Sequence, residues 1–272
     1  IAGTNELYGG TGNDMIFGGT GNDIIHGGGG VNTVNYSEAT SGVTVDLGST
    51  AEQTVGGGQG IDTLQNIQNI IGSTYDDVFK SNHTVGNHFN GNGFQTNGDT
   101  VDYSNITVND VEQDFVRVNL STNTGLITIG ASLSATDTYT NIQNITGTSG
   151  NDTLIGNNQA NTLLGGAGDD VIDGGRGTNY LHGGTGENTL IYDSVTGVNG
   201  IKVNIGSSDF VVNSETIAAN RSYRDADISE VYGFQNINGS SNDDVLIGND
   251  EVNIIRGGDG TDTIYGGKNS NF

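Results

Sequence analysis

Residues 147–191 read GTSGNDTLI, GNNQANTLL, GGAGDDVID, GGRGTNYLH and GGTGENTLI, which are five consecutive nine-residue repeats. Glycine recurs at the first, second and fourth positions, Asp or Asn at the sixth, and an aliphatic residue at the eighth. The same step runs from Gly9 to Asn35 and again from Gly239, with isolated copies at Gly57 and Gly72. A fixed period of this kind is typical of a solenoid, in which each repeat packs only on its neighbours.

Each position of the repeat has an expected physical role. Glycines at positions one, two and four predict a tight turn with positive φ angles. Positions seven to nine predict a short strand whose middle residue points inward, and two repeats would make one coil. The expected aliphatic ladder leaves Ile255 out, has Ile254 at its border, and consists of Ile16, Ile25, Leu154, Leu163, Ile172, Leu181, Leu190, Leu246 and Ile264.

Composition restricts both the core and the partners. The chain has 47 Gly, no Pro and 32% hydrophobic residues, which is enough to line a thin core but not to fill a wide one. Thirty-two acidic residues against eight basic ones give a formal charge of -24, so a compact state requires cations and nucleic acid is not an expected partner. The absence of Cys excludes disulfides and thiolate metal sites. No apolar stretch approaches the roughly 18 residues of a membrane span.

Stacked turns of this sequence predict several calcium sites. Sixth-position oxygens and glycine carbonyls from repeats n and n+2 would converge on one point, and Ca²⁺ takes about 6–8 oxygen ligands. Two Asp–Asp pairs should bind best, Asp152 with Asp170 and Asp244 with Asp262. Mixed pairs should bind less tightly: Asn5 with Asp23, Asp14 with Asn32, and Asp170 with Asn188. The other expected ligands are Asp62 and Asp77 in the isolated copies and the glycines Gly9, Gly18, Gly27, Gly147, Gly165, Gly183, Gly239 and Gly257.

Two pairs contain only asparagine, Asn161 with Asn179 and Asn253 with Asn271. They either bind calcium weakly or form a hydrogen-bonded ladder without an ion, and the sequence leaves both readings open.

The tandem runs resemble the repeats-in-toxin (RTX) family of bacterial proteins, over about half of the chain. The resemblance implies an all-β fold, a right-handed parallel β-roll or β-solenoid, with Ca²⁺ as its cofactor. It also implies export by type I secretion machinery, folding on calcium outside the cell, and an extracellular or cell-surface location. We expect the chain to be a segment of a larger protein, because it begins and ends within a repeat.

Three strand-rich inserts interrupt the repeats. Each opens near a tyrosine (Tyr36, Tyr103, Tyr192), continues with an alternating strand, and closes on an Asn/Ile phrase such as NIQNI at Asn66. We interpret them as wider coils of the solenoid or as flanking strands that cap each block, and the tyrosines as packing residues rather than a sugar-stacking platform. The predicted division is 1–35, 72–102 (degenerate), 147–191 and 239–272 as β-roll blocks, with inserts at 36–71, 103–146 and 192–238.

No catalytic motif is recognisable. The four histidines form no HExxH pattern, and the glycine clusters belong to repeat turns rather than phosphate loops. We therefore expect a non-catalytic segment of an adhesin, surface-layer or filament protein, with possible self-assembly or a cell-surface ligand. The alternatives are a calcium module of a secreted enzyme or toxin and, more remotely, an ice-binding face formed by TGND at Thr11 and Thr20.

Overall fold

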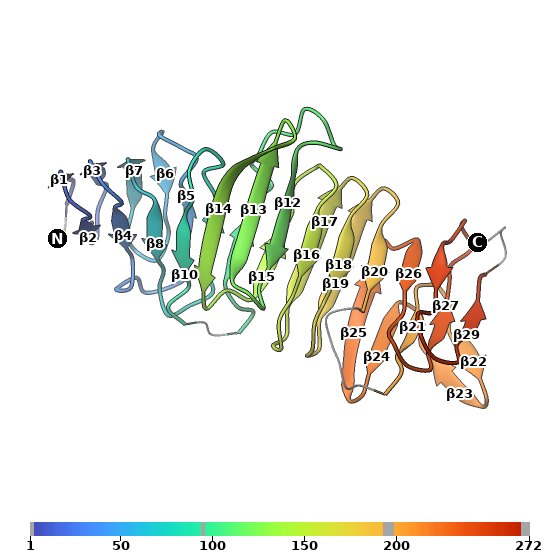
Figure 1. The fold of residues 1–272 in the computed structure, drawn as a ribbon. Helices are drawn as coiled ribbons and strands as arrows, with labels where there is room; N and C mark the ends of the chain where they lie inside the picture. The colour runs from blue at the N-terminus through green and yellow to red at the C-terminus, as the bar shows by residue number, and fades with distance from the viewer. Residues whose placement is uncertain (1–2, 94–95, 193–198, 268–272) are drawn as a thin grey trace. The chain divides into compact units, whose positions relative to one another are not determined.

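The computed structural model describes residues 3–93, 96–192 and 199–267, which are all-β and contain no helix. No helix that could span a membrane is found among them. The chain divides into two compact units, residues 1–107 with 122–146 and residues 108–121 with 147–272. Figure 1 shows the strands, which are short because each repeat contributes only a few extended residues.

The strands of the first unit are β1 (Glu6–Gly10), β2 (Met15–Ile16), β3 (Ile24–Gly28), β4 (Thr33–Asn35), β5 (Thr44–Asp46), β6 (Gln53–Thr54), β7 (Ile61–Gln65), β8 (Asn69–Ile71), β9 (Val78–Lys80), β10 (His88–Asn90), β11 (Thr100–Asp102), β13 (Thr124–Ile129), β14 (Ser132–Thr140) and β15 (Asn144–Thr146). Within this unit they follow the orders β1-β3-β7-β6, β2-β4-β8-β10-β14-β13 and β15-β11-β9-β5.

The strands of the second unit are β12 (Phe115–Asn119), β16 (Thr153–Ile155), β17 (Thr162–Ala167), β18 (Val171–Asp173), β19 (Tyr180–Thr185), β20 (Thr189–Ile191), β21 (Lys202–Asn204), β22 (Phe210–Val212), β23 (Glu215–Ile217), β24 (Arg221–Arg224), β25 (Asp227–Tyr232), β26 (Asn236–Asn238), β27 (Val245–Ile247), β28 (Ile255–Arg256) and β29 (Thr263–Tyr265). Their orders are β12-β16-β18-β20-β26-β28, β29-β27-β21-β24-β25-β19-β17 and the pair β22-β23.

Strand pairing confirms the expected spacing of two repeats. Leu154 lies opposite Ile172 and Leu163 opposite Leu181, in parallel pairs of strands from alternate repeats. Consecutive repeats therefore enter different sheets, and every second repeat enters the same one.

The insert strands join the same sheets. The alternating strand of each insert appears as β5, β12 and β21, and each pairs in parallel with the first strand of the following block, β9, β16 and β27. The sheets of the repeats therefore continue through the inserts. Antiparallel strands widen the inserts further, as in β13 with β14 and β24 with β25.

Eighth-position side chains form the core, as the alternation predicts. Leu154, Leu163, Ile172, Leu181 and Leu190 are at most 1% exposed. The expected ladder was wrong by one residue at Gly248. Ile255 is the eighth residue of that repeat and lies opposite Ile237, whereas Ile254 is 37% exposed. Ile264 is also 46% exposed, because β29 is the outermost strand of its sheet.

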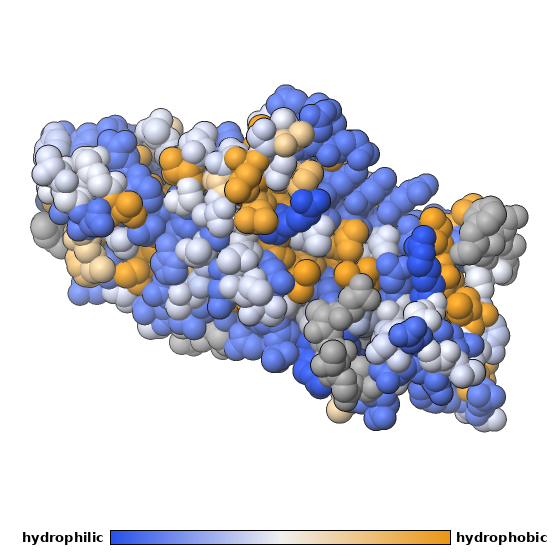
Figure 2. Space-filling view, viewed as in Figure 1, coloured by the Kyte–Doolittle hydropathy of each residue, from blue (hydrophilic) through white to orange (hydrophobic). Residues whose placement is uncertain are grey.

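The three insert tyrosines are packing residues. Tyr36 and Tyr103 are fully buried and Tyr192 is 5% exposed, so none offers a ring face to a sugar. Tyr36 donates a hydrogen bond to Asp62 Oδ2 (2.9 Å), and Tyr103 donates one to Asp137 Oδ2 (2.9 Å). Outside the core, hydrophilic side chains dominate the face drawn in Figure 2, as the acidic composition requires.

The buried ladder can be tested by truncation. Ile172→Ala should lower the free energy of unfolding by about 3 kcal/mol, because it leaves a cavity between β16 and β20. Val252→Ala, at a side chain 55% exposed, is the control and should change it by less than about 0.5 kcal/mol. Urea unfolding in saturating calcium, followed by circular dichroism, measures both variants, and similar losses would contradict the ladder.

Candidate calcium-binding turns

Sixth-position side chains form a ladder between alternate repeats. In each pair, one side-chain oxygen accepts a hydrogen bond from the backbone N–H of the sixth residue 18 positions earlier. The expected strong pairs are joined in this way, Asp170 Oδ1 to Asp152 N (2.9 Å) and Asp262 Oδ1 to Asp244 N (3.0 Å). The mixed pairs are joined by the same bond. Oδ1 of the later residue accepts from the backbone N–H of the earlier one in Asp23 with Asn5 (2.8 Å), Asn32 with Asp14 (3.1 Å) and Asn188 with Asp170 (2.9 Å).

The ladder also continues across the inserts. Asp62 Oδ1 accepts from Asp23 N (3.0 Å) although 39 residues separate them, and Asp99 Oδ1 accepts from Asp77 N (2.8 Å). Asp99 therefore holds a true sixth position in the block that the sequence marked as degenerate. Both oxygens of Asp62 have partners within the protein, Asp23 N and the Tyr36 hydroxyl.

First-position glycines face two oxygens at once. A Cβ on Gly9 would lie 2.6 Å from the carbonyl oxygen of Gly27 and 2.7 Å from Asp14 Oδ2. The corresponding groups crowd Gly147, Gly165 and Gly239. A carboxylate oxygen and a main-chain carbonyl from alternate repeats therefore approach the same point, and only glycine leaves room for them.

Positive φ angles occur at second-position glycines such as Gly10 (φ 115°) and at most fourth-position glycines, such as Gly168 (φ 104°). At position one, Gly57 (φ 56°) has a positive φ angle, but Gly9 and Gly165 do not. The expected φ angles were therefore wrong for Gly9 and Gly165, where glycine instead leaves room for the oxygens that converge on that point.

Four of these carboxylates carry a buried oxygen without a hydrogen-bond donor. Oδ2 of Asp14, Asp23, Asp99 and Asp170 has no hydrogen-bond partner among the described residues. An unsatisfied buried oxygen is costly, and for a carboxylate the cost is greater still. Burial raises the pKa of Asp170 to about 8. These oxygens, together with the nearby carbonyls, are hard donors of the kind that Ca²⁺ prefers.

The donors cannot all be side chains. Among the described residues, no three His, Cys, Asp or Glu side chains group together closely enough to hold a metal. An ion at these turns would therefore have to combine one or two sixth-position carboxylates with main-chain carbonyls, such as those of Gly27 and Gly183.

The first repeat of each later block is different. Its second residue is Ser or Thr, and this residue donates to the sixth-position carboxylate through both its amide and its hydroxyl. Ser240 N and Oγ bind Asp244 (2.6 and 2.9 Å), and Ser73 N and Oγ bind Asp77 (2.8 and 2.7 Å). Thr148 holds Asp152 in the same way. We call this arrangement the hydroxyl clasp.

The insert strand completes each clasp. Val43, Val116 and Ile201 donate their backbone N–H to Asp77, Asp152 and Asp244, each at 2.8 Å. In the pairs expected to bind best, Asp152 and Asp244 thus have protein donors on both oxygens. Asp170, which lacks a donor on Oδ2, is the member of its pair with an oxygen left for a cation.

Asparagine at position six places an amide where a cation would bind. Asn179 Nδ2 donates to the carbonyls of Arg176 (3.3 Å) and Gly177 (3.1 Å), and Asn179 Oδ1 accepts from Asn161 N (2.9 Å). This geometry corresponds to the hydrogen-bonded ladder, one of the two readings left open by the sequence. Asn32 and Asn188 likewise donate to the carbonyls of Asn66 (3.0 Å) and Gly233 (2.9 Å). Asn271, the partner expected for Asn253, lies outside the described residues.

Glutamine occupies the ladder at three turns that the sequence analysis missed. Gln68, Gln143 and Gln235 accept from the backbone N–H of Asn32, Asp99 and Asn188, each at 2.8 Å. All three lie in the Asn/Ile phrases that close the inserts. The glutamine repeated in these phrases was the available signal, but the turn is too short to fit the nine-residue period.

Histidines contribute to none of these turns. His88 contacts the Thr138 hydroxyl (2.9 Å), and His26 stacks on Tyr8 with ring centroids 4.7 Å apart.

Acid should stabilise the calcium-free fold. Burial raises the pKa of Asp170 to about 8 and that of Asp152 to about 6, whereas an unfolded Asp titrates near 3.9. The folded chain thus binds protons more tightly than the unfolded chain, so this stability is present at low pH and is lost as pH rises from about 4 through about 8. In protein stripped of calcium at pH 7.5 and then kept calcium-free, the β signal in circular dichroism should be larger at pH 5 than at pH 8. A β signal that grows with pH would contradict the burial of these acids.

Comparison with protein families agrees with this geometry. The family model described as the RTX calcium-binding nonapeptide repeat matches four times, at residues 2–34, 142–170, 155–190 and 238–272. No curated protein sequence matches the chain. The matches include the turns of Asp14, Asp23 and Asp170 but not those of Asp62 and Asp77. RTX repeats bind calcium and are typical of secreted bacterial proteins. The chain therefore carries the calcium-binding nonapeptide repeats of the RTX family.

Proposed function

We propose that this chain is a non-catalytic, calcium-binding segment of a large extracellular protein, exported by type I secretion and folded by calcium after export. Its repeats would form a right-handed parallel β-roll, with Ca²⁺ ions bound between alternate turns. The parent protein would be an adhesin, a surface-layer protein or a filament component.

The observation that carries this proposal is the unpartnered carboxylate oxygen. Asp14 Oδ2 and the Gly27 carbonyl approach one point, and that carboxylate oxygen is buried without a donor. Asp170 Oδ2 and the Gly183 carbonyl repeat the arrangement at Gly165. A bound Ca²⁺ would neutralise the carboxylate and bridge two turns, while the residues themselves would fix the turn and exclude water.

Net charge supports a switch that depends on calcium concentration. With a formal charge of -24, the chain repels itself when calcium is scarce, as in the cytosol, and remains extended enough for export. Outside the cell, calcium binds only the folded turns, so binding contributes directly to folding.

Calcium removal tests the proposed switch. In EGTA at pH 7.5 the far-ultraviolet circular dichroism should lose most of its β signal, and calcium should restore it cooperatively. Magnesium at equal concentration is the control and should restore little, because it prefers a stricter octahedral geometry. Full β structure in EGTA would contradict folding by calcium.

One substitution tests where calcium binds. Asp170→Asn should weaken calcium binding by at least about tenfold, equivalent to about 1.4 kcal/mol, because the amide cannot replace the unpartnered oxygen. The exposed Asp259→Asn removes the same charge from another repeat turn and should leave affinity nearly unchanged. Isothermal titration calorimetry compares the two variants, and equal losses would mean that net charge, rather than this site, controls affinity.

A further inference from the structure

The residue at the second position differs between repeat turns, and so do the hydrogen bonds of the sixth-position carboxylate. In the turns of Asp14 and Asp170 the second residue is a glycine with a positive φ angle, Gly10 (φ 115°) and Gly166 (φ 118°). Oδ2 of both carboxylates is buried and has no hydrogen-bond partner among the described residues. We call these two the open turns.

The turns with a hydroxyl clasp have Thr or Ser at the second position. Thr148, Ser73 and Ser240 have no positive φ angle, as expected for residues with a Cβ. Thr148 N donates to Asp152 Oδ2 (2.5 Å), and Thr148 Oγ1 donates to the same carboxylate (3.0 Å) and accepts from the fourth-position N–H of Gly150 (2.9 Å). Ser73 and Ser240 bond in the same way. We call these three the clasped turns.

Open and clasped turns are alike at the point where an ion would bind. A Cβ on Gly165 would lie 2.2 Å from Asp170 Oδ2 and 2.4 Å from the carbonyl oxygen of Gly183. In the clasped turn, a Cβ on Gly147 would lie 2.4 Å from Asp152 Oδ2 and 2.4 Å from the carbonyl oxygen of Gly165. Oδ1 of each carboxylate accepts a backbone N–H. The two carboxylates differ at Oδ2, which has protein donors only in the clasped turn.

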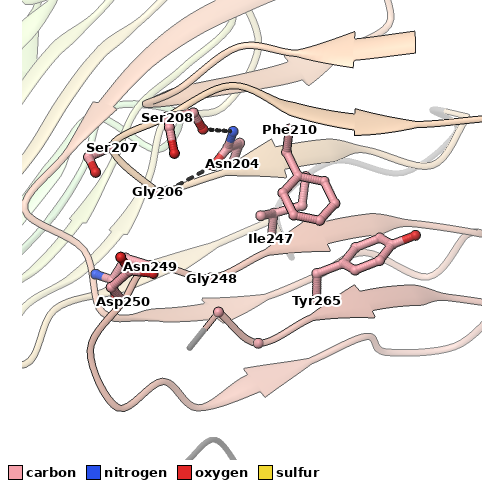
Figure 3. Close-up of a pocket in the computed structure, with 12 residues that line it drawn as sticks. Asn204, Gly206, Ser207, Ser208, Phe210, Ile247, Gly248, Asn249, Asp250 and Tyr265 are labelled. Carbon is pink, nitrogen blue, oxygen red and sulfur yellow. Dashed lines mark hydrogen bonds between the residues drawn. The ribbon is translucent and has the colours of Figure 1, made fainter. Parts of the chain in front are cut away.

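Asparagine at the second position also bonds to the sixth-position side chain. Asn249 lies beside a pocket that Phe210 of the hairpin strand β22 and Tyr265 of β29 also line (Figure 3). Asn249 has no positive φ angle, and its Oδ1 accepts from the fourth-position N–H of Glu251 (2.9 Å) and from Asn253 Nδ2 (2.7 Å). A polar second residue thus engages both the fourth and the sixth position in this turn as well.

We propose that the second position of the repeat decides which turns bind calcium. A glycine with a positive φ angle gives Oδ2 of the carboxylate no N–H, so this oxygen is left for an ion. Thr or Ser places the hydrogen atoms of an N–H and an O–H where the ion would have to approach, and such bonds to a charged oxygen are strong. Asp77, Asp152 and Asp244 therefore bind no ion of their own, although each holds a sixth position. The inference rests on the proposed binding of calcium at the open turns.

The number of calcium ions bound per chain tests the inference. Equilibrium dialysis in saturating calcium counts them, after circular dichroism has verified that each variant is folded. Thr148→Gly removes the hydroxyl and permits a positive φ angle, so it should bind one more ion than the wild type. Thr148→Ser keeps both donors and is the matched control, and it should bind the same number as the wild type.

A second pair of variants needs no change in the turn backbone. Asp152→Asn should leave the number of bound ions unchanged, because the clasped carboxylate holds none. Asp170→Asn removes the same charge from an open turn and should lose one ion. Ser240→Gly repeats the expected gain at another clasped turn and replaces Thr148→Gly if that variant does not fold.

Two counts would overturn the inference: a folded Thr148→Gly variant that binds only the wild-type number of ions, or an Asp152→Asn variant that loses one. An ion on Asp152 Oδ2 in crystals of the calcium-loaded wild type would also contradict it, and this measurement decides the matter if the variants do not fold. Failure of the proposed function is distinguishable, because the wild type itself would then bind no calcium.

Discussion

The fold depends on buried carboxylate oxygens that lie near main-chain carbonyls and have no hydrogen-bond donor among the described residues. At Gly9 and Gly165, a sixth-position carboxylate oxygen and a carbonyl from the next repeat but one approach the same point, in a space that any side chain would fill. Burial makes the charged carboxylate unfavourable for the protein alone, and it raises the pKa of Asp170 to about 8. In the proposed arrangement, a bound Ca²⁺ would neutralise that charge and cross-link two turns. The thin aliphatic core then needs only to align the strands.

At the two ends of a repeat block, side chains and amides of the protein supply the hydrogen bonds of the ladder. At its start, a serine or threonine hydroxyl and two amides satisfy the carboxylate, as Ser240 does for Asp244. At its end, the side-chain oxygen of a glutamine such as Gln235 takes the place of the carboxylate oxygen and accepts from Asn188 N. The Asn188 side-chain amide in turn donates to the carbonyl of Gly233. In the proposed arrangement, calcium-binding turns would lie between turns held by hydrogen bonds, and the ladder itself continues through the inserts.

The period predicted most of the repeat structure, because each position of the repeat that carries glycine, the sixth-position oxygen or the eighth-position aliphatic residue has its own physical role. The register of the Asp152–Asp170 and Asp244–Asp262 pairs followed directly from it. The hydroxyl clasp did not, because Thr148 departs from the glycine pattern and nothing in the period marks it as a donor. Gln68 was missed because its turn is three residues shorter and its longer side chain spans the difference. The pocket at Phe210 and Tyr265 depends on how an insert hairpin packs on a distant repeat, which no local pattern encodes.

A crystal structure of the calcium-loaded protein, with ions located by anomalous scattering, tests the central claim most directly. The account predicts an ion bound to Asp170 Oδ2 together with the Gly183 carbonyl, and another bound to Asp14 Oδ2 together with the Gly27 carbonyl. It predicts no ion between Asn161 and Asn179, because the Asn179 side-chain amide donates to the carbonyls of Arg176 and Gly177. Folded turns at Asp14 and Asp170 with no ion, in saturating calcium, would contradict it.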